Sequence, residues 1–249
     1  MSFDYESVEG NYQHTAHMHP RSVRHFWHDA KLKLLTSQVE IAGGGHVVDV
    51  GCGSGNASIA IARTGCTVTG LDLSSQAIAF CTQRAAQEGI NAKFLKITGK
   101  KLPLRDASAD IVISSEVIEH LSDPAEHLRE LHRILRPNGT LILTTPNYRS
   151  AWPLLEFISD TLRLTPKMRG EQHIFFVTPK KLHTLLHSTG FTPKVISSYY
   201  GISPFINPFS PSLARRLFSR ELTHPRTARM ILYTVARKIA RKNAREAAA

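Results

Sequence analysis

The sequence predicts an α/β protein built on a doubly wound, mostly parallel sheet of seven strands. Short apolar runs rich in β-branched residues alternate along the chain with stretches of helical spacing. Parallel strands connected in this way need helical crossovers that cover both faces of the sheet. The first apolar run, VVDV at residues 47–50, passes directly into the glycine turn GCGSG. This sequence is typical of a buried strand that ends where a ligand approaches the backbone closely.

The first helix is expected over residues 22–39, where Phe26 and Ala30 belong to an apolar series at helical spacing. It follows a polar, histidine-rich arm over residues 1–20. Three consecutive glycines at 43–45 separate this helix from the first strand.

The last elements depend on less regular patterns. Gly190 separates a predicted helix at 178–188 from a predicted strand at 191–200. Residues 230–237, MILYTVAR, fit either a strand or an amphipathic helix, and their apolar groups on both alternating faces favour a strand. In chain order, the predicted helices cover residues 22–39, 56–63, 75–87, 123–135 and 178–188, and the predicted strands cover residues 46–50, 67–71, 92–96, 110–114, 140–145, 191–200 and 230–237.

Composition narrows the class of protein. The chain has 249 residues, 42% of them hydrophobic, which is enough for one large domain with appendages. No signal peptide and no run of 18 apolar residues is apparent, so we expect a cytoplasmic protein. Three cysteines without CxxC spacing argue against disulfides and a thiolate zinc site. The net charge of +11 favours acidic partners such as nucleic acid, anionic lipid or phosphorylated substrates, without choosing among them.

The glycine turn has a distinctive spacing. Gly51, Gly53 and Gly55 alternate, and Asp49 precedes them by two positions, whereas a GxGxxG pattern would space the last two glycines further apart. About 20 residues later, Asp72 ends the second predicted strand, where a carboxylate can accept hydrogen bonds from two ribose hydroxyls. Together with the downstream LRPNGTLILTTPN, this combination closely resembles the motifs of class I S-adenosylmethionine-dependent methyltransferases.

The resemblance covers about residues 45–200 and implies a Rossmann-like methyltransferase fold with S-adenosyl-L-methionine as cofactor. It also implies roles for individual positions. Asp49 and the turn formed by Gly51, Gly53 and Gly55 would flank the methionine moiety. Asp72 would bind the ribose, and Leu73 would pack on the adenine. Many relatives have an acidic residue near the adenine amino group, and here Thr98 or a backbone group would take its place, while Lys31 would also contact the cofactor.

A second constellation lies in SSEVIEHLSDP. Ser115 follows the fourth predicted strand, next to the expected position of the methyl donor, and Glu116, Glu119 and His120 come directly after it. If the backbone forms a helical turn here, the two carboxylates share a face beside the imidazole and can converge on a divalent cation. Hard oxygen ligands favour Mg²⁺ or Mn²⁺ over zinc.

This ExxEH pattern is similar to that of ubiquinone-pathway O-methyltransferases and to that of small-RNA 2′-O-methyltransferases, where it binds metal. In the latter family a further histidine completes the site, and His173 in GEQHIFFVTPKKL occupies the matching place. Three interpretations stay open for the constellation: a metal site, a lining of the substrate cleft, or a structural role.

The expected function is O-methylation of a small hydrophobic hydroxylated acceptor, either phenolic or like a quinone precursor. Methyl transfer from a sulfonium is an in-line displacement, and a hydroxyl acceptor must lose or share its proton. His120, beside Glu116, is the natural general base if no metal takes part. One alternative is metal-dependent 2′-O-methylation of RNA, which the ExxEH pattern, His173 and the basic charge favour. A non-catalytic cofactor-binding protein is the other.

The predicted domain organisation has three parts. An N-terminal arm and helix cover residues 1–44, a methyltransferase domain covers residues 45–237, and a basic tail covers residues 238–249. Within the domain, the apolar and aromatic segments 147–172 and 201–225 are expected either to form a lid and a docking surface at a membrane face or to pack onto the sheet. The oligomeric state stays open.

Overall fold

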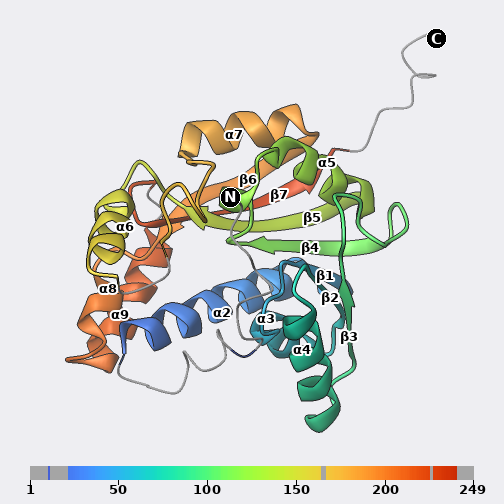
Figure 1. The fold of residues 1–249 in the computed structure, drawn as a ribbon, viewed down its shortest axis with the longest axis horizontal. Helices are drawn as coiled ribbons and strands as arrows, with labels where there is room; N and C mark the ends of the chain where they lie inside the picture. The colour runs from blue at the N-terminus through green and yellow to red at the C-terminus, as the bar shows by residue number, and fades with distance from the viewer. Residues whose placement is uncertain (1–10, 12–21, 164–166, 225–226, 240–249) are drawn as a thin grey trace.

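Seven strands form one sheet in the computed structural model, which describes residues 11, 22–163, 167–224 and 227–239. The strands are β1 His46–Val50, β2 Thr67–Asp72, β3 Ala92–Lys96, β4 Ala109–Ser115, β5 Leu135–Pro146, β6 Phe191–Tyr199 and β7 Ile231–Lys238. Their order is β3-β2-β1-β4-β5-β7-β6, and β7 pairs antiparallel with both of its neighbours (Figure 1). The predicted fold class, a doubly wound and mostly parallel seven-stranded sheet, is confirmed.

Several helices begin at a polar side chain that caps them. Ser22, Ser74, Asp123 and Thr178 each accept a hydrogen bond from a backbone N–H in the first turn of the following helix. Each such cap stabilises a helix by about 1 kcal/mol. The helices are α2 Val23–Ile41, α3 Asn56–Ala62, α4 Ser75–Gln87, the 3₁₀ turn η3 Ile118–His120, α5 Pro124–Ile134, α6 Trp152–Thr161, α7 Pro179–Ser188, α8 Ser203–Ile206 and α9 Pro211–Thr223.

The sheet separates two apolar layers, because side chains alternate along each strand. On β1, Val47 belongs to the core formed with α2 and α3, whereas Val48 belongs to the core formed with α5 and α7. On β4, Ile113 and Val112 divide in the same way. Figure 1 shows α2, α3 and α4 on one side of the sheet and α5 and α7 on the other.

The two inserts contain helices that the sequence pattern did not indicate. The insert after β5 includes α6, and the segment 201–225 contains α8 and α9, which lie beside α6 at one end of the sheet in Figure 1. Strand β5 also begins earlier than expected, because Leu135 already pairs with Ala109 before a register shift leads to the pair of Thr140 with Ile111.

The predicted N-terminal arm, residues 1–20, lies outside the described residues except for Asn11, and the predicted basic tail lies outside them from residue 240 onward. Among the described helices, none combines the length and the apolar character needed to cross a membrane. Cys52 and Cys81 are buried, and Cys66 is half-buried.

The strand order places a topological switch between β1 and β4. The chain proceeds from β1 outward to β3 and then returns to pair β4 with the other side of β1. At such a point the connections leave in opposite directions and open a crevice beyond the carboxyl ends of the strands. The residues that follow β1 and β4 therefore face the same crevice.

Candidate active site

A cavity of about 260 Å³ lies beyond the carboxyl ends of β1 and β4. The lining joins the glycine turn after β1, the segment after β4, one face of α2 and the insert after β5. The lining residues are Trp27, His28, Lys31, Leu32, Leu35, Asp49, Gly51, Cys52, Asn56, Ala57, Ser115, Glu116, Glu119, His120, Pro146, Trp152, Met168, Gln172 and His173.

The glycine turn requires glycine for two reasons. Gly51, Gly53 and Gly55 all have φ between 51° and 77°, a region that residues with a Cβ rarely adopt. A Cβ on Gly51 would also lie 2.5 Å from Cγ2 of Val117, and one on Gly55 would lie 2.7 Å from Sγ of Cys81. The turn therefore brings its backbone close to the segment after β4.

Asp49 supplies a buried carboxylate at this end of the cavity. Its Oδ2 accepts a hydrogen bond from Oγ of Ser58 at 2.6 Å. Burial raises the pKa of Asp49 to about 6, and the negative charge of Asp72 adds to the shift. Removing the carboxylate from water disfavours its charged form, so a cationic ligand in the cavity would be favoured beside it.

Asp72, at the end of β2, is fixed by backbone groups. Its Oδ2 accepts a hydrogen bond from the N–H of Gly53 at 2.8 Å, and its Oδ1 accepts one from the N–H of Ser74 at 2.9 Å. The next side chain, Leu73, is 47% exposed. Asp72 thus links the glycine turn to the start of α4, and the exposed apolar side chain of Leu73 lies directly after it in the chain.

Glu116 and Lys31 form an ion pair in the middle of the cavity wall. Nζ of Lys31, from α2, lies 2.9 Å from Oε2 of Glu116. Burial opposes ionisation of Glu116, but the neighbouring ammonium outweighs it and lowers the pKa of Glu116. Glu116 has φ of 56° and precedes η3, while its N–H continues the sheet by donating to Thr144.

Glu119, His120 and His173 converge at the other end of the cavity. One carboxylate oxygen and one nitrogen of each imidazole lie within 4.8 Å of one another. Nδ1 of His120 donates to the carbonyl of Gln172 at 2.7 Å, and Oε2 of Glu119 accepts from Oγ1 of Thr145 at 3.0 Å. Among the described residues, Oε1 of Glu119 is buried without a hydrogen-bond partner.

Burial shifts the pKa values of Glu119 and His120 in opposite directions. It raises the pKa of Glu119 to about 7, with a further increase from the negative charge of Glu116. It lowers the pKa of His120 to about 4. At neutral pH, His120 is therefore uncharged and can accept a proton, and Glu119 is poised near its titration midpoint.

The structure departs from the predicted metal set at Glu116. Three of the four expected residues, Glu119, His120 and His173, come together, but Glu116 lies outside this group and is paired with Lys31. The expected helical turn begins only at Ile118, after the left-handed conformation at Glu116, so the two carboxylates do not share a helical face.

Other predicted site residues are distributed as follows. Ser115 lines the cavity, and its hydroxyl forms a hydrogen bond with that of Thr144 at 2.8 Å. Thr98 is exposed just beyond β3 and is not among the cavity-lining residues, and its role beside the adenine stays a prediction.

Sequence reasoning missed Glu156 and Tyr148, which lie behind His173. Oε1 of Glu156 accepts hydrogen bonds from the hydroxyl of Tyr148 at 2.7 Å and from Nδ1 of His173 at 2.6 Å. A signal was present in the sequence: Glu156 is a lone carboxylate within the apolar run WPLLEFI.

The strand order and the cavity beside the glycine turn indicate the class of the protein, a methyltransferase of the Rossmann-like type. A family profile described as "Methyltransferase domain" matches residues 48–143. The ubiquinone biosynthesis O-methyltransferase of Pseudomonas fluorescens is 31% identical over 169 residues, which cover 67% of this chain and 72% of that protein. The mitochondrial enzyme of that name from Arabidopsis thaliana is 31% identical over 71% of this chain, but the match spans only 53% of the plant protein.

A solved S-adenosylmethionine-dependent methyltransferase from Aquifex aeolicus shares the fold with a TM-score of 0.56 and 15% identity, over 82% of this chain and 89% of that one. The chain belongs to the family of S-adenosylmethionine-dependent methyltransferases that includes the ubiquinone biosynthesis O-methyltransferases.

Proposed function

We propose that this methyltransferase transfers a methyl group to a hydroxyl oxygen of a small, largely apolar acceptor that is phenolic or resembles a quinone precursor. The observation that carries the proposal is that one cavity joins the turn at Asp49 and Gly51 to the cluster of Glu119, His120 and His173. The names of the two relatives, which are ubiquinone biosynthesis O-methyltransferases, support oxygen as the acceptor atom.

The residues around the glycine turn fit S-adenosyl-L-methionine. Glycine at positions 51 and 55 allows the positive φ angles of the turn and its close packing on Val117 and Cys81. Gly51 lines the cavity, and buried Asp49 suits the cationic methionine end of the molecule. Asp72, held by two backbone N–H groups, would accept the ribose hydroxyls, and exposed Leu73 would cover the adenine. When bound, the cofactor supplies an electrophilic methyl group on a sulfonium.

The cluster at the other end also fits a divalent cation. His120 and His173 each commit Nδ1 to an acceptor, which leaves Nε2 as the nitrogen that carries the lone pair. The buried Oε1 of Glu119 adds one oxygen donor. Two imidazoles and one carboxylate suit Mn²⁺ or another first-row ion better than Mg²⁺, which prefers oxygen ligands. Such an ion would orient an acceptor hydroxyl and lower its pKa.

Without a metal ion at the cluster, proton removal from the acceptor falls to Glu119 and His120. His120 is uncharged at neutral pH and has Nδ1 fixed by Gln172, so its Nε2 can accept a proton. Glu119, with a pKa of about 7, is the stronger base of the two and is better matched to neutral pH. The acceptor would lie against Trp27, Trp152 and Met168, which supply the apolar part of the lining.

The insert helix α6 supports docking at a membrane face. It exposes Leu154, Phe157 and Leu162 by 62%, 59% and 62%, and Phe209, near the start of α9, is 88% exposed. Helix α9 also exposes Arg215, Arg216 and Arg220. Apolar side chains beside such basic groups suit the interface of an anionic bilayer, where they could receive a lipid-soluble acceptor. The alternative is that a partner or another part of the chain covers them.

RNA is the second candidate acceptor, because His173 joins Glu119 and His120 as the resemblance to small-RNA 2′-O-methyltransferases implied. Its prediction is methylation of a 3′-terminal ribose, with RNA binding that weakens steeply as salt increases.

The experiment that tests the proposal measures transfer of a radiolabelled methyl group to a panel of catechols, phenolic lipids and short RNAs. Each assay is run without EDTA, with EDTA, and with Mn²⁺ added back after EDTA treatment. We expect labelling of a catechol or phenolic lipid that EDTA reduces and Mn²⁺ restores. Labelling of RNA alone would favour the second candidate, and activity insensitive to EDTA would remove the metal from the proposal.

A further inference from the structure

We infer that Glu156, on the insert helix α6, is a positioning residue that holds His173 in the tautomer with its lone pair on Nε2. This inference rests on the proposed function, since it concerns the acceptor end of the same cavity. It makes the insert a component of the site and not only a cover over it.

The hydrogen bonds around Glu156 determine which nitrogen of His173 carries the proton. The hydroxyl of Tyr148 donates to Oε1 of Glu156 at 2.7 Å, so this oxygen acts as an acceptor. Nδ1 of His173 lies 2.6 Å from the same oxygen and 3.1 Å from the Tyr148 hydroxyl. Because the hydroxyl proton goes to the carboxylate at the shorter distance, Nδ1 donates to Glu156 and is the protonated nitrogen. In a neutral imidazole the lone pair then resides on Nε2, the nitrogen that remains for a ligand.

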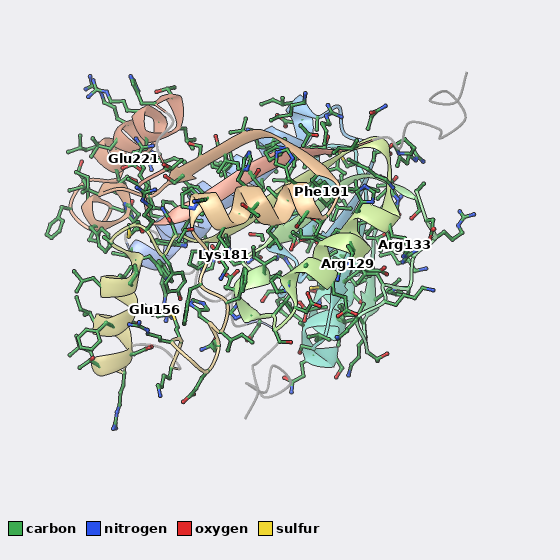
Figure 2. All side chains as sticks on the ribbon, turned by 90° about the horizontal axis from the view of Figure 1, so that it is seen from above. Arg129, Arg133, Glu156, Lys181, Phe191 and Glu221 are labelled. Carbon is green, nitrogen blue, oxygen red and sulfur yellow. The ribbon has the colours of Figure 1, made fainter. Side chains whose placement is uncertain are left out.

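The packing of α6 indicates that this contact is more than incidental. Glu156 is fully buried, while Leu154 and Phe157 on the same helix are more than half exposed, which reverses the usual polarity of a surface helix. Figure 2 labels Glu156 on this helix, at one end of the molecule. Burying a carboxylate is costly unless it is hydrogen-bonded or compensated by positive charge.

In the part of the chain that the structure describes, the second carboxylate oxygen of Glu156 has no hydrogen bond that would offset the cost of burial, so the contacts of Oε1 must supply that compensation. Among the described residues, Oε2 is buried and has no hydrogen-bond partner, although Oε1 accepts two hydrogen bonds. A carboxylate that donates its charge through an imidazole to a ligand on the opposite nitrogen is the usual outer partner of a ligand-binding histidine. A carboxylate that only anchored α6 would not need to contact the ring of His173.

The test reads the tautomer directly. In protein labelled with ¹⁵N-histidine and without metal or acceptor, long-range ¹H–¹⁵N spectra should show His173 protonated on Nδ1. Glu156→Gln, which keeps an acceptor oxygen, should retain this tautomer. Glu156→Leu should shift it toward Nε2–H or a mixture and lower kcat about 10- to 100-fold, with the Kd for S-adenosylmethionine unchanged.

Asp160→Ala is the matched control, because Asp160 lies on the same helix but accepts hydrogen bonds from the N–H groups of Met168 and Arg169. It should loosen that loop and leave the tautomer of His173 unchanged. A wild-type protein with His173 protonated on Nε2 would overturn the inference, as would a folded Glu156→Leu variant that keeps Nδ1–H. The spectra need no methyl transfer, so they succeed or fail independently of the proposed function.

Discussion

Nζ of Lys31 lies 2.9 Å from Oε2 of Glu116, although 85 positions separate the two residues in the chain. The pair ties α2 to the segment after β4, between the two ends of the cavity. Both side chains are largely withdrawn from solvent, with 15% and 27% of their surface exposed. Oε1 of Glu116 is buried and has no hydrogen-bond partner among the described residues, so its charge depends on Lys31.

Lys31→Met should therefore destabilise the protein more than the double variant Lys31→Met/Glu116→Gln. Removing one partner of a fully buried pair costs roughly 3–5 kcal/mol, and the partial exposure of this pair reduces that cost. Denaturant unfolding of the wild type, both single variants and the double variant measures the coupling free energy. Single-variant effects that simply add would show that the pair makes no contribution to stability.

His120→Ala should lower kcat by about 10²- to 10⁴-fold, the usual contribution of a positioned acid or base. The Kd for S-adenosylmethionine should change little, since His120 lies at the acceptor end of the cavity. Calorimetric titration of the cofactor and steady-state kinetics provide the two readouts. Unchanged turnover would remove His120 from the proposed mechanism.

Asp72→Ala should weaken cofactor binding by at least roughly 10- to 100-fold, because the loss of even one hydrogen bond to a charged group costs about 1.5–3 kcal/mol. The variant also removes the acceptor for the N–H of Gly53, so the glycine turn loses a support. Asp72→Asn, which retains acceptor oxygens, should bind the cofactor with intermediate affinity. Equal affinities for all three proteins would contradict the assignment of the ribose to Asp72.

Glu119 should make stability depend on pH in the metal-free protein. Its pKa in the folded state, about 7, lies above the ordinary value of 4.5 because of burial. Its stabilising contribution is thus complete below pH 4.5 and is lost as pH rises through 7, by up to about 3 kcal/mol. In EDTA, the free energy of unfolding of Glu119→Gln minus that of the wild type should therefore increase as the pH is raised from 5 to 8. A constant difference over this range would show that the carboxylate ionises normally.

Gly51→Ala should unfold more readily than wild type and lose cofactor affinity. Its φ of 77° strains an alanine by about 1–2 kcal/mol, and the new methyl group would collide with Val117. Gly89→Ala is the control, because Gly89 also has a positive φ of 63° but has no atom within 4 Å of an added Cβ. The control should show the strain alone, with normal cofactor binding. An equal loss of affinity in both variants would contradict a special role for the glycine turn.

Local patterns were sufficient to predict the sheet. A β-branched run marks each of the strands β1 and β2, and a glycine or a polar residue follows it directly, so both strands were located within one residue of their observed ends. The same holds for α4, which covers the predicted range of residues 75–87. Helix α6 was missed because its exposed face is apolar and its buried face carries Glu156, so its pattern does not resemble an ordinary surface helix.

The partners within the site depend on tertiary packing and could not be predicted. Glu116 was expected beside Glu119, but its left-handed backbone and the distant Lys31 direct it away. The contact of His173 with Glu156 likewise requires α6 to fold back over the segment after β4. The resemblance to small-RNA 2′-O-methyltransferases was sufficient to predict that His173 lies beside Glu119 and His120, and the structure brings these three residues together.

The most direct measurement is the identity of the methylated atom. With ¹³C-methyl-labelled S-adenosylmethionine and the best acceptor of the panel, the carbon chemical shift of the product distinguishes O-methyl from N-methyl and C-methyl groups. We expect a single O-methyl product from the wild type and a greatly reduced yield from His120→Ala. Methylation of nitrogen or carbon, or equal O-methylation by both proteins, would contradict hydroxyl methylation at the cluster of Glu119, His120 and His173.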